Sequence, residues 1–474
     1  MLQTIELMLF NSIQFLIFFF IVCCTYFLIP DRFKWLLLLI ASCYFYMAFV
    51  PVYILILGGT IVVDYFAGLL IYKYYQRRRF FLILSLIANI GVLAVFKYYN
   101  FLNANLSHLI GAFGYKNHIP YLSMLLPIGL SFHTFQAMSY TIEVYRGKQK
   151  PEKHFGIYAL YVMFFPQLVA GPIERPQNML HQFHEKHDFD YYRIVSGLKI
   201  MLWGFVKKVV VADRLAIYVN TVYSHPDKHS AITLAVATIF FSFQIYCDFS
   251  GYSDIAVGTA KVLGYNLMLN FRRPYFAKDI REFWSRWHIS LSTWFRDYLY
   301  IPLGGNRVSV PRWYLNLFIV FVVSGLWHGA NWTFIIWGAL HGCFIVLGLI
   351  IQKISPKKFA VPGFINVLIT FVLVSFAWIF FRANNIHDAF TVARSILIWK
   401  KGPFFVGDVN EFSYSIFALV FLLLVEFKQE YFNTSFSLLY NNNKLVRQFA
   451  YVLLLLMIIT IGVFNGGQFI YFQF

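Results

Sequence analysis

Apolar runs long enough to cross a bilayer recur along most of the 474 residues, and this feature constrains the fold more than any other. A transmembrane helix needs about 20 consecutive apolar residues. Because lipid offers no partner for backbone polar groups, such runs predict helices. We expect apolar segments at residues 8–29, 34–56, 57–73, 80–97, 121–142, 155–172, 194–211, 231–259, 313–327, 332–351, 363–381, 412–427 and 447–464. The pattern predicts an all-α, polytopic integral membrane protein with about 11–13 transmembrane or re-entrant helices.

The composition favours one integral membrane domain over residues 1–474. Hydrophobic residues make up 59% of the chain and charged residues 13%, whereas soluble domains carry about 25% charged residues. No Ser/Gly-rich linker or repeat period divides the chain. The five cysteines show no CxxC spacing, so the sequence indicates neither a zinc ribbon nor a disulfide framework. The first apolar run lacks the basic flank and cleavage site of a signal peptide, so we expect it to stay in the membrane.

The net charge of +18 comes largely from basic clusters between the apolar runs. Examples are Arg77–Arg79, Lys207–Lys208 and Lys353 to Lys358. The positive-inside rule places such residues in cytoplasmic loops, beside anionic lipid. The distribution therefore indicates the lipid bilayer as a partner and argues against nucleic acid.

One ionisable side chain, His328, lies between apolar runs in the segment Ser324–Trp332. A polar group at that depth is costly, so it marks a functional site by default. Glycines on either side permit a helix break, and histidine exchanges protons near neutral pH. Simple packing is the competing interpretation. We predict His328 as a catalytic base, with substrate contacts from Trp327, Asn331 and Trp332.

A second unusual region, residues 270–312, is basic and aromatic. At helical spacing one face carries Phe283, Trp287, Leu291 and Trp294/Phe295, while Arg281, Ser285, Ser292 and Arg296 lie elsewhere. Such a segment can lie at the membrane interface or enter a protein-lined funnel. We predict His288 as a second catalytic residue and Arg286, Arg296 and Asp297 as substrate-binding residues. A membrane anchor is the alternative interpretation of this cluster.

The remaining polar residues favour structural explanations. His181, His184 and His187 occupy a hydrophilic loop without a matching carboxylate or cysteine set, so we expect solvated histidines and no metal site. His341 is expected to pack in the core. Asp248 and Asp254 are expected to join a structural network, with a proton-relay or ion site as the alternative. No nucleophile elbow or Walker A loop is present.

Several motifs resemble one known family over nearly the whole chain. They are Leu126–Phe132, Glu143–Gly147, Ala170–Ile173, Gly204–Lys208, Asp248–Asp254, Glu282–Tyr300, Leu303–Arg307, Gly325–Trp332 and Phe469–Phe474. In this order they resemble the membrane-bound O-acyltransferases, specifically the bacterial branch typified by alginate O-acetyltransferase. The Trp-Arg-Trp-His and Trp-His-Gly-Ala-Asn blocks are the most specific.

The resemblance implies that His328 corresponds to the signature catalytic histidine and His288 to the second polar position of the active site. It implies a tunnel, or two funnels, meeting at these residues in a multi-pass protein of the bacterial cytoplasmic (inner) membrane. The expected donor is cytoplasmic acetyl-CoA, which acts as a substrate rather than a bound cofactor. The acetyl group is expected to pass to a periplasmic partner acyltransferase or directly to a glycan, as in alginate biosynthesis-like systems.

Two alternatives remain open at this point. A D-alanyl transferase for teichoic acids would use an acyl carrier protein as donor. A secondary transporter would also combine many helices with intramembrane acids, although the sequence shows no repeat of the kind that transporters carry.

Overall fold

A computed structural model describes residues 8–123, 127, 129–168, 171–354, 362–432, 439–464 and 469–470. These residues form helices and connecting loops, and no strand occurs among them. Leu126, Ile128, Ala170, Lys357, Lys358 and the last four residues of the C-terminal motif lie outside the described residues. The chain forms two compact units, one of residues 1–201 and 255–268, the other of residues 202–254 and 269–474. Two of the three boundaries fall inside α10 (Tyr191–Phe205) and α12 (Ala231–Leu263), and the third lies in the loop after α12. The expectation of one integral domain stays a prediction.

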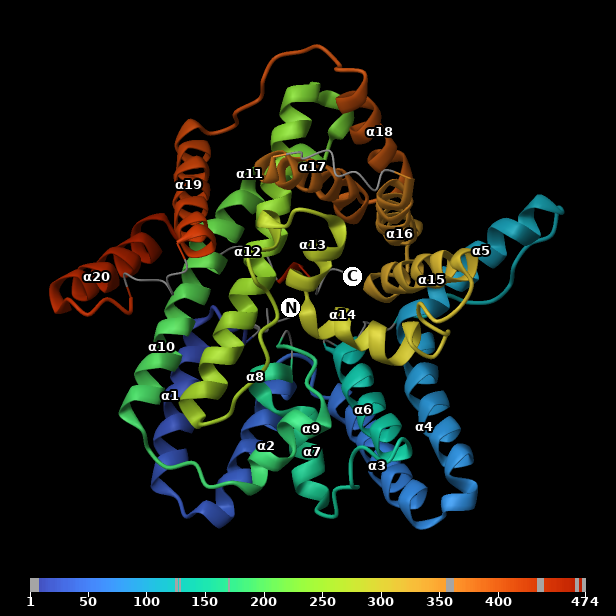
Figure 1. Cartoon of the computed structure of the whole chain (residues 1–474), viewed down its shortest axis with the longest axis vertical. Coiled ribbons are helices and arrows are strands. Elements are labelled where there is room, and N and C mark those ends of the chain that lie inside the picture. Colours follow the sequence, from blue (N-terminus) through green and yellow to red (C-terminus); the bar gives the residue numbers. More distant parts are fainter. Residues whose placement is uncertain are drawn as a thin grey trace. The chain divides into compact units, whose positions relative to one another are not determined.

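The first unit is built from short and medium helices (Figure 1). They are α1 (Ile13–Leu28), α2 (Asp31–Met47), α3 (Tyr53–Lys73), η1 (Tyr75–Arg77), α4 (Arg78–Leu93), η2 (Ala94–Tyr98), α5 (Tyr99–Ala112), α6 (Leu130–Tyr145), α7 (Phe155–Met163), α8 (Phe165–Leu168), α9 (Pro176–Met179) and η3 (His181–His184), with parts of α10 and α12.

A buried polar cluster joins α3 to α4 inside this unit. Asp64 is fully buried and accepts hydrogen bonds from Ser85 Oγ at 2.6 Å and from Asn89 Nδ2 at 2.9 Å. The Ser85 hydroxyl also lies 3.2 Å from that of Thr141 on α6. Buried polar groups need such partners, so the cluster fixes how α3, α4 and α6 pack.

The second unit contains all predicted site residues. Its elements are η4 (Val206–Ala212), α11 (Asp213–Tyr223), η5 (Pro226–Lys228), most of α12, η6 (Pro274–Phe276), α13 (Ile280–Arg286), α14 (Ile289–Phe295), η7 (Arg296–Tyr300), α15 (Val310–His328), α16 (Trp332–Ile354), α17 (Gly363–Arg382), α18 (Ile386–Leu397), α19 (Val409–Tyr431) and α20 (Lys444–Ile461).

Among the described residues, eight helices are long and apolar enough to cross a membrane. They cover residues 53–73, 75–112, 231–263, 310–328, 332–354, 363–382, 409–431 and 444–461. Side chains such as Leu445 and Ile459 on α20 are 74% and 71% exposed, as expected for a helix facing lipid. The all-α, polytopic membrane fold is confirmed. The larger predicted number included α1, α2 and α6, which span 16, 17 and 16 residues.

A buried ion network holds η4 against α12 in the second unit. Lys208 Nζ lies 2.7 Å from both Asp213 Oδ1 and Asp248 Oδ1, and Lys207 pairs with Asp254. Asp248 Oδ2 also accepts a hydrogen bond from the backbone N–H of Ile470 at 2.8 Å. The prediction that Asp248 and Asp254 belong to a structural network is confirmed.

Candidate active site

His328 is the last residue of α15 and is buried in an aromatic cage. Its side chain is 3% exposed, and its ring centroid lies 5.0 Å from Trp337 on α16 and 5.3 Å from Phe381 on α17. The neighbouring Trp327 ring lies 4.9 Å away. Rigid aromatic neighbours from three helices fix the imidazole and keep bulk water from it.

Glycines allow α15 and α16 to approach closely just before His328. Ideal Cβ atoms built on Gly325 and Gly338 would each stand 2.2 Å from a backbone oxygen of the facing helix, Phe334 O and Phe321 O respectively. Only residues without a side chain fit there, as is typical of closely packed membrane helices. The glycines near His328 therefore set the helix packing that positions the histidine.

His288 sits at a break between α13 and α14. Its backbone has φ of +42°, in the left-handed region that non-glycine residues rarely adopt. Two backbone hydrogen bonds of 2.9 Å hold the break, from Ile289 N to Asn270 O and from Arg272 N to Arg286 O. The side chain is fully buried, and this burial lowers the pKa of His288 to about 3. His288 is therefore neutral at physiological pH.

The helix face predicted across residues 283–295 is buried as expected, but two short helices carry it instead of one continuous helix. The apolar positions of that face are buried, whereas Arg281, Ser285 and Arg296 are exposed. The helix is interrupted at residues 287–288. The 3.6-residue pattern survives the break because both short helices pack their aromatic sides inward.

Trp327 connects the two predicted catalytic histidines. Its ring centroid lies 6.3 Å from that of His288 and 4.9 Å from that of His328. The histidines come from segments 40 residues apart in the sequence, and the fold places both against one indole. Sequence spacing could not show this proximity.

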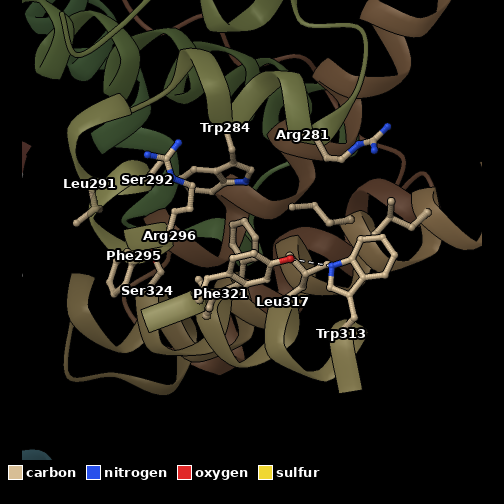
Figure 2. Close-up of a pocket in the computed structure, with 14 residues that line it drawn as sticks. Arg281, Trp284, Leu291, Ser292, Phe295, Arg296, Trp313, Leu317, Phe321 and Ser324 are labelled. Carbon is tan, nitrogen blue, oxygen red and sulfur yellow. Dashed lines mark hydrogen bonds between the residues drawn. The ribbon is translucent and has the colours of Figure 1, made fainter. Parts of the chain in front are cut away.

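An apolar pocket of about 320 Å³ opens beside this aromatic cluster (Figure 2). It is lined by Arg281, Trp284, Leu291, Ser292, Phe295, Arg296, Tyr300, Trp313, Leu317, Val320, Phe321, Ser324, Ile345 and Leu349. Figure 2 shows Arg281 and Arg296 toward opposite sides of the view. Ser324 lies one helical turn before His328 on α15, so the pocket reaches within a turn of the imidazole. His288 and His328 are not among its lining residues.

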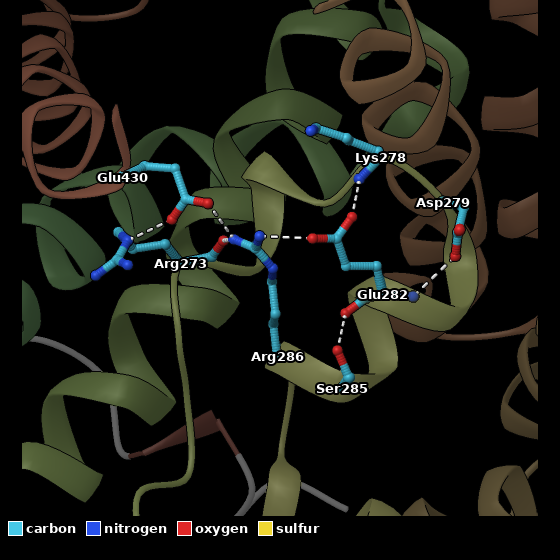
Figure 3. Close-up of polar contacts among 7 residues, drawn as sticks. All are labelled: Arg273, Lys278, Asp279, Glu282, Ser285, Arg286 and Glu430. Carbon is cyan, nitrogen blue, oxygen red and sulfur yellow. Dashed lines mark hydrogen bonds and ion pairs between the residues drawn. The ribbon is translucent and has the colours of Figure 1, made fainter. Parts of the chain in front are cut away.

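Arg286 belongs to an ion network with Glu282, Glu430 and Arg273 (Figure 3). Its guanidinium contacts Glu430 Oε1 at 2.8 Å and Glu282 Oε1 at 2.6 Å, and Glu430 also binds Arg273 at 2.7 Å. The network ties α13 to the end of α19. Two carboxylates hold the Arg286 guanidinium in this structure. The predicted role of Arg286 in substrate binding stays a prediction.

The other predicted substrate-binding residues are spread around the site. Arg296 lines the pocket, and its Nε donates to Asp297 Oδ1 at 2.8 Å. Asn331 accepts a hydrogen bond from the Thr333 backbone N–H at 3.1 Å, next to the start of α16. Trp332 is 48% exposed and does not line the pocket. The predicted substrate contact of Trp332 stays a prediction.

Comparison with known proteins identifies the family. The model of the membrane-bound O-acyltransferase family matches residues 153–387. A protein named probable alginate O-acetylase in Pseudomonas aeruginosa is 38% identical, covering 89% of this chain and 81% of that protein. The chain belongs to the membrane-bound O-acyltransferase family. It is an O-acyltransferase, and the resemblance drawn from its motifs is confirmed.

Two further relatives differ in the chemistry that their names state. A peptidoglycan O-acetyltransferase of Helicobacter pylori is 37% identical, over 79% of this chain and 77% of the relative. A teichoic acid D-alanyltransferase of Bacillus subtilis is 26% identical, over 57% of this chain and 72% of the relative. These relatives are named as transferases, and none of the three is named as a transporter.

In this O-acyltransferase, Trp337 and Trp284 also lie at the candidate site, and the sequence did not single them out. Trp337 lies between His328 and His341, with ring centroids 5.0 Å from each. Trp284 lines the pocket and donates its Nε1–H to His341 Nδ1 at 3.3 Å. His341 is fully buried, in agreement with its predicted packing role. A tryptophan four residues before a histidine on one helix was the available signal.

The loop histidines of the first unit separate into two groups. His181 and His184 are exposed as predicted, and His184 lies 2.8 Å from Glu152 Oε2. The prediction of a solvated side chain is wrong for His187, which is buried with its Nε2 2.8 Å from Gln182 O. The ring packs against Tyr265, with ring centroids 4.4 Å apart, and local polarity cannot reveal such a contact with a distant segment.

Proposed function

We propose that this enzyme transfers acetyl groups from cytoplasmic acetyl-CoA to hydroxyls of an envelope or exported polysaccharide, through a partner acyltransferase outside the cytoplasmic membrane. The observation that carries the proposal is the pairing of His328 and His288 against Trp327, one helical turn from a pocket flanked by two arginines. The site thus combines a buried base with a space suited to an anionic, partly apolar donor.

The pocket fits an acyl thioester of coenzyme A. Its apolar walls suit the pantetheine arm, and the guanidiniums of Arg281 and Arg296 suit phosphates, for which arginine offers a bidentate fork. Ser324 marks the side of the pocket nearest to His328. Passing only the acetyl group onward avoids taking phosphates through hydrocarbon.

His328 is proposed to act as the general base. Its ring accepts the proton of an acceptor hydroxyl as the oxygen attacks the thioester carbonyl carbon. The new ester C–O bond forms, the C–S bond breaks, and the departing thiolate takes the proton from the imidazolium. The surrounding Trp327, Trp337 and Phe381 limit hydrolysis of the thioester by excluding water.

The named relatives support acetyl transfer over D-alanyl transfer. The two relatives named for alginate and peptidoglycan acetylation are 38% and 37% identical and cover 89% and 79% of this chain. The D-alanyltransferase of Bacillus subtilis is 26% identical over 57% of the chain. D-alanyl transfer from a carrier protein is therefore the second candidate.

A strain that lacks this gene tests the proposal. Mass spectrometry of its envelope and exported polysaccharides should show the loss of species heavier by one acetyl group. The wild-type gene should restore these species, and a His328→Ala gene of equal membrane abundance should not. Unchanged acetylation would contradict the proposal, and loss of D-alanyl groups instead would establish the second candidate.

A further inference from the structure

Asn270 contacts His288 through the side chain as well as the backbone. Asn270 Oδ1 lies 3.2 Å from His288 Nδ1, 3.2 Å from the backbone N of Ser290 and 2.9 Å from Ser290 Oγ. Asn270 is 1% exposed, and His288 and Ser290 are fully buried. One buried amide oxygen thus faces three buried groups.

These contacts decide which atoms carry hydrogen. A backbone N–H can only donate, so the Asn270 atom that faces Ser290 N is the amide oxygen. An oxygen can only accept, so the Nδ1 atom of His288 beside it carries a proton. With the opposite tautomer two lone pairs would face each other at 3.2 Å. In a neutral ring the lone pair then lies on Nε2.

We infer that Asn270 is a positioning residue that holds His288 as the Nδ1–H tautomer, so that His288 Nε2 acts as a hydrogen-bond acceptor toward the acceptor hydroxyl. A ring in this state cannot donate from Nε2 to the thioester carbonyl. The tautomer is inferred from the Asn270 contacts, with the Ser290 hydroxyl, 3.4 Å from His288 Nδ1, donating to Asn270 Oδ1 at 2.9 Å instead. The role toward the hydroxyl rests on the proposed function.

Backbone hydrogen bonds join the segment that carries Asn270 to the segment that carries His288. Ile289 N donates to Asn270 O, and Arg272 N donates to Arg286 O, each at 2.9 Å. Arg286 is held in turn by Glu430 and Glu282, as Figure 3 shows. The amide therefore keeps its place beside the imidazole without depending on a bound substrate.

His341 provides an internal comparison with the opposite tautomer. The Trp284 indole Nε1–H can only donate, and it faces His341 Nδ1 at 3.3 Å. A neutral His341 therefore carries its proton on Nε2. Two buried histidines of one unit are thus held in different tautomers by neighbours with opposite hydrogen-bonding character.

Nitrogen-15 NMR of the full-length protein labelled at histidine in bilayers measures the tautomer directly. Wild-type protein should show a neutral Nδ1–H signal that disappears in His288→Gln. Asn270→Leu, which has a similar shape and no acceptor, should lose that signal, and Asn270→Asp should keep the proton on Nδ1. Trp284→Phe is the matched control and should alter only the His341 signal. A bare Nδ1 on His288 in the wild type would overturn the inference.

Kinetics test the role of this tautomer in turnover. Asn270→Leu should lower kcat for acetyl transfer by about 100-fold, because a wrong tautomer removes a hydrogen-bond acceptor from the reaction, and should leave KM for acetyl-CoA unchanged. A fall in folded protein alone, with full kcat per folded molecule, would contradict the positioning role. If the wild-type protein showed no acetyl-transfer activity, this would contradict the proposed function. The NMR experiment would still decide the tautomer of His288.

Discussion

Gly325→Ala is the sharpest test of how the fold positions His328. A Cβ at residue 325 would stand 2.2 Å from Phe334 O, while real Cβ contacts essentially never fall under 3.0 Å. The atom that must move is backbone, so α15 and α16 have to separate by roughly 1 Å. A misplacement of about 1 Å in a catalytic group costs about 100-fold in rate. We therefore expect a loss of about 100-fold in acetyl transfer.

The assay is transfer of radiolabelled acetyl from acetyl-CoA in membranes that contain equal amounts of each variant. Gly348→Ala is the matched control, because Gly348 lies on α16, the helix that faces Gly325, and a Cβ there meets nothing within 4 Å. Gly348→Ala should retain wild-type activity. Full activity of Gly325→Ala at normal abundance would refute the argument that close helix packing positions the imidazole.

Three other substitutions examine separate parts of the site. His288→Ala should lower kcat by about 100- to 10,000-fold, the usual range for a group engaged in proton transfer, and unchanged turnover would remove His288 from the site. Arg296→Ala should raise KM for acetyl-CoA several-fold with little effect on kcat, because the Arg296 side chain lines the pocket, is 59% exposed and lies away from the imidazole. An unchanged KM, measured by initial rates, would argue against phosphate binding there. Lys208→Met should destabilise the fold by about 3–5 kcal/mol, because it leaves Asp213 and Asp248 buried without their cation, and an unaltered thermal unfolding profile in detergent would contradict this.

The sequence predicted the fold class because a segment that crosses a membrane must be a long apolar run and must form a helix. Long apolar runs became long helices, and the boundaries of α16 and α17 lie within three residues of those predicted. The number of helices was harder to predict, because α7 has only nine residues and still lies buried. Apolar composition alone does not separate a membrane-crossing helix from a buried one.

The sequence indicated individual site residues, but it could not show how they lie relative to one another. His328 and His288 stood out because a polar ring among apolar residues is costly, but their common contact with Trp327 depends on the tertiary fold. The sequence points to Trp332, because Trp332 adjoins the histidine motif. The start of α16 leaves Trp332 half-exposed and turns Trp337 toward His328.

The helix break at His288 had no sequence signal. Neither glycine nor proline marks residues 286–289. The left-handed backbone is held by hydrogen bonds from Ile289 N–H to Asn270 O and from Arg272 N–H to Arg286 O. Partners that lie 18 residues earlier in the chain cannot be found from local propensity. Such a tertiary override of local pattern is expected at functional sites.

The central claim is that His328 accepts the proton during acetyl transfer from a thioester. The most direct measurement encloses labelled acetyl-CoA in proteoliposomes with wild-type or His328→Ala protein and supplies the partner acyltransferase and the polysaccharide outside. It follows label in polysaccharide and release of free coenzyme A. We expect transfer and coenzyme A release with the wild type and neither with His328→Ala, although both proteins insert equally. Equal transfer by the two proteins would contradict it.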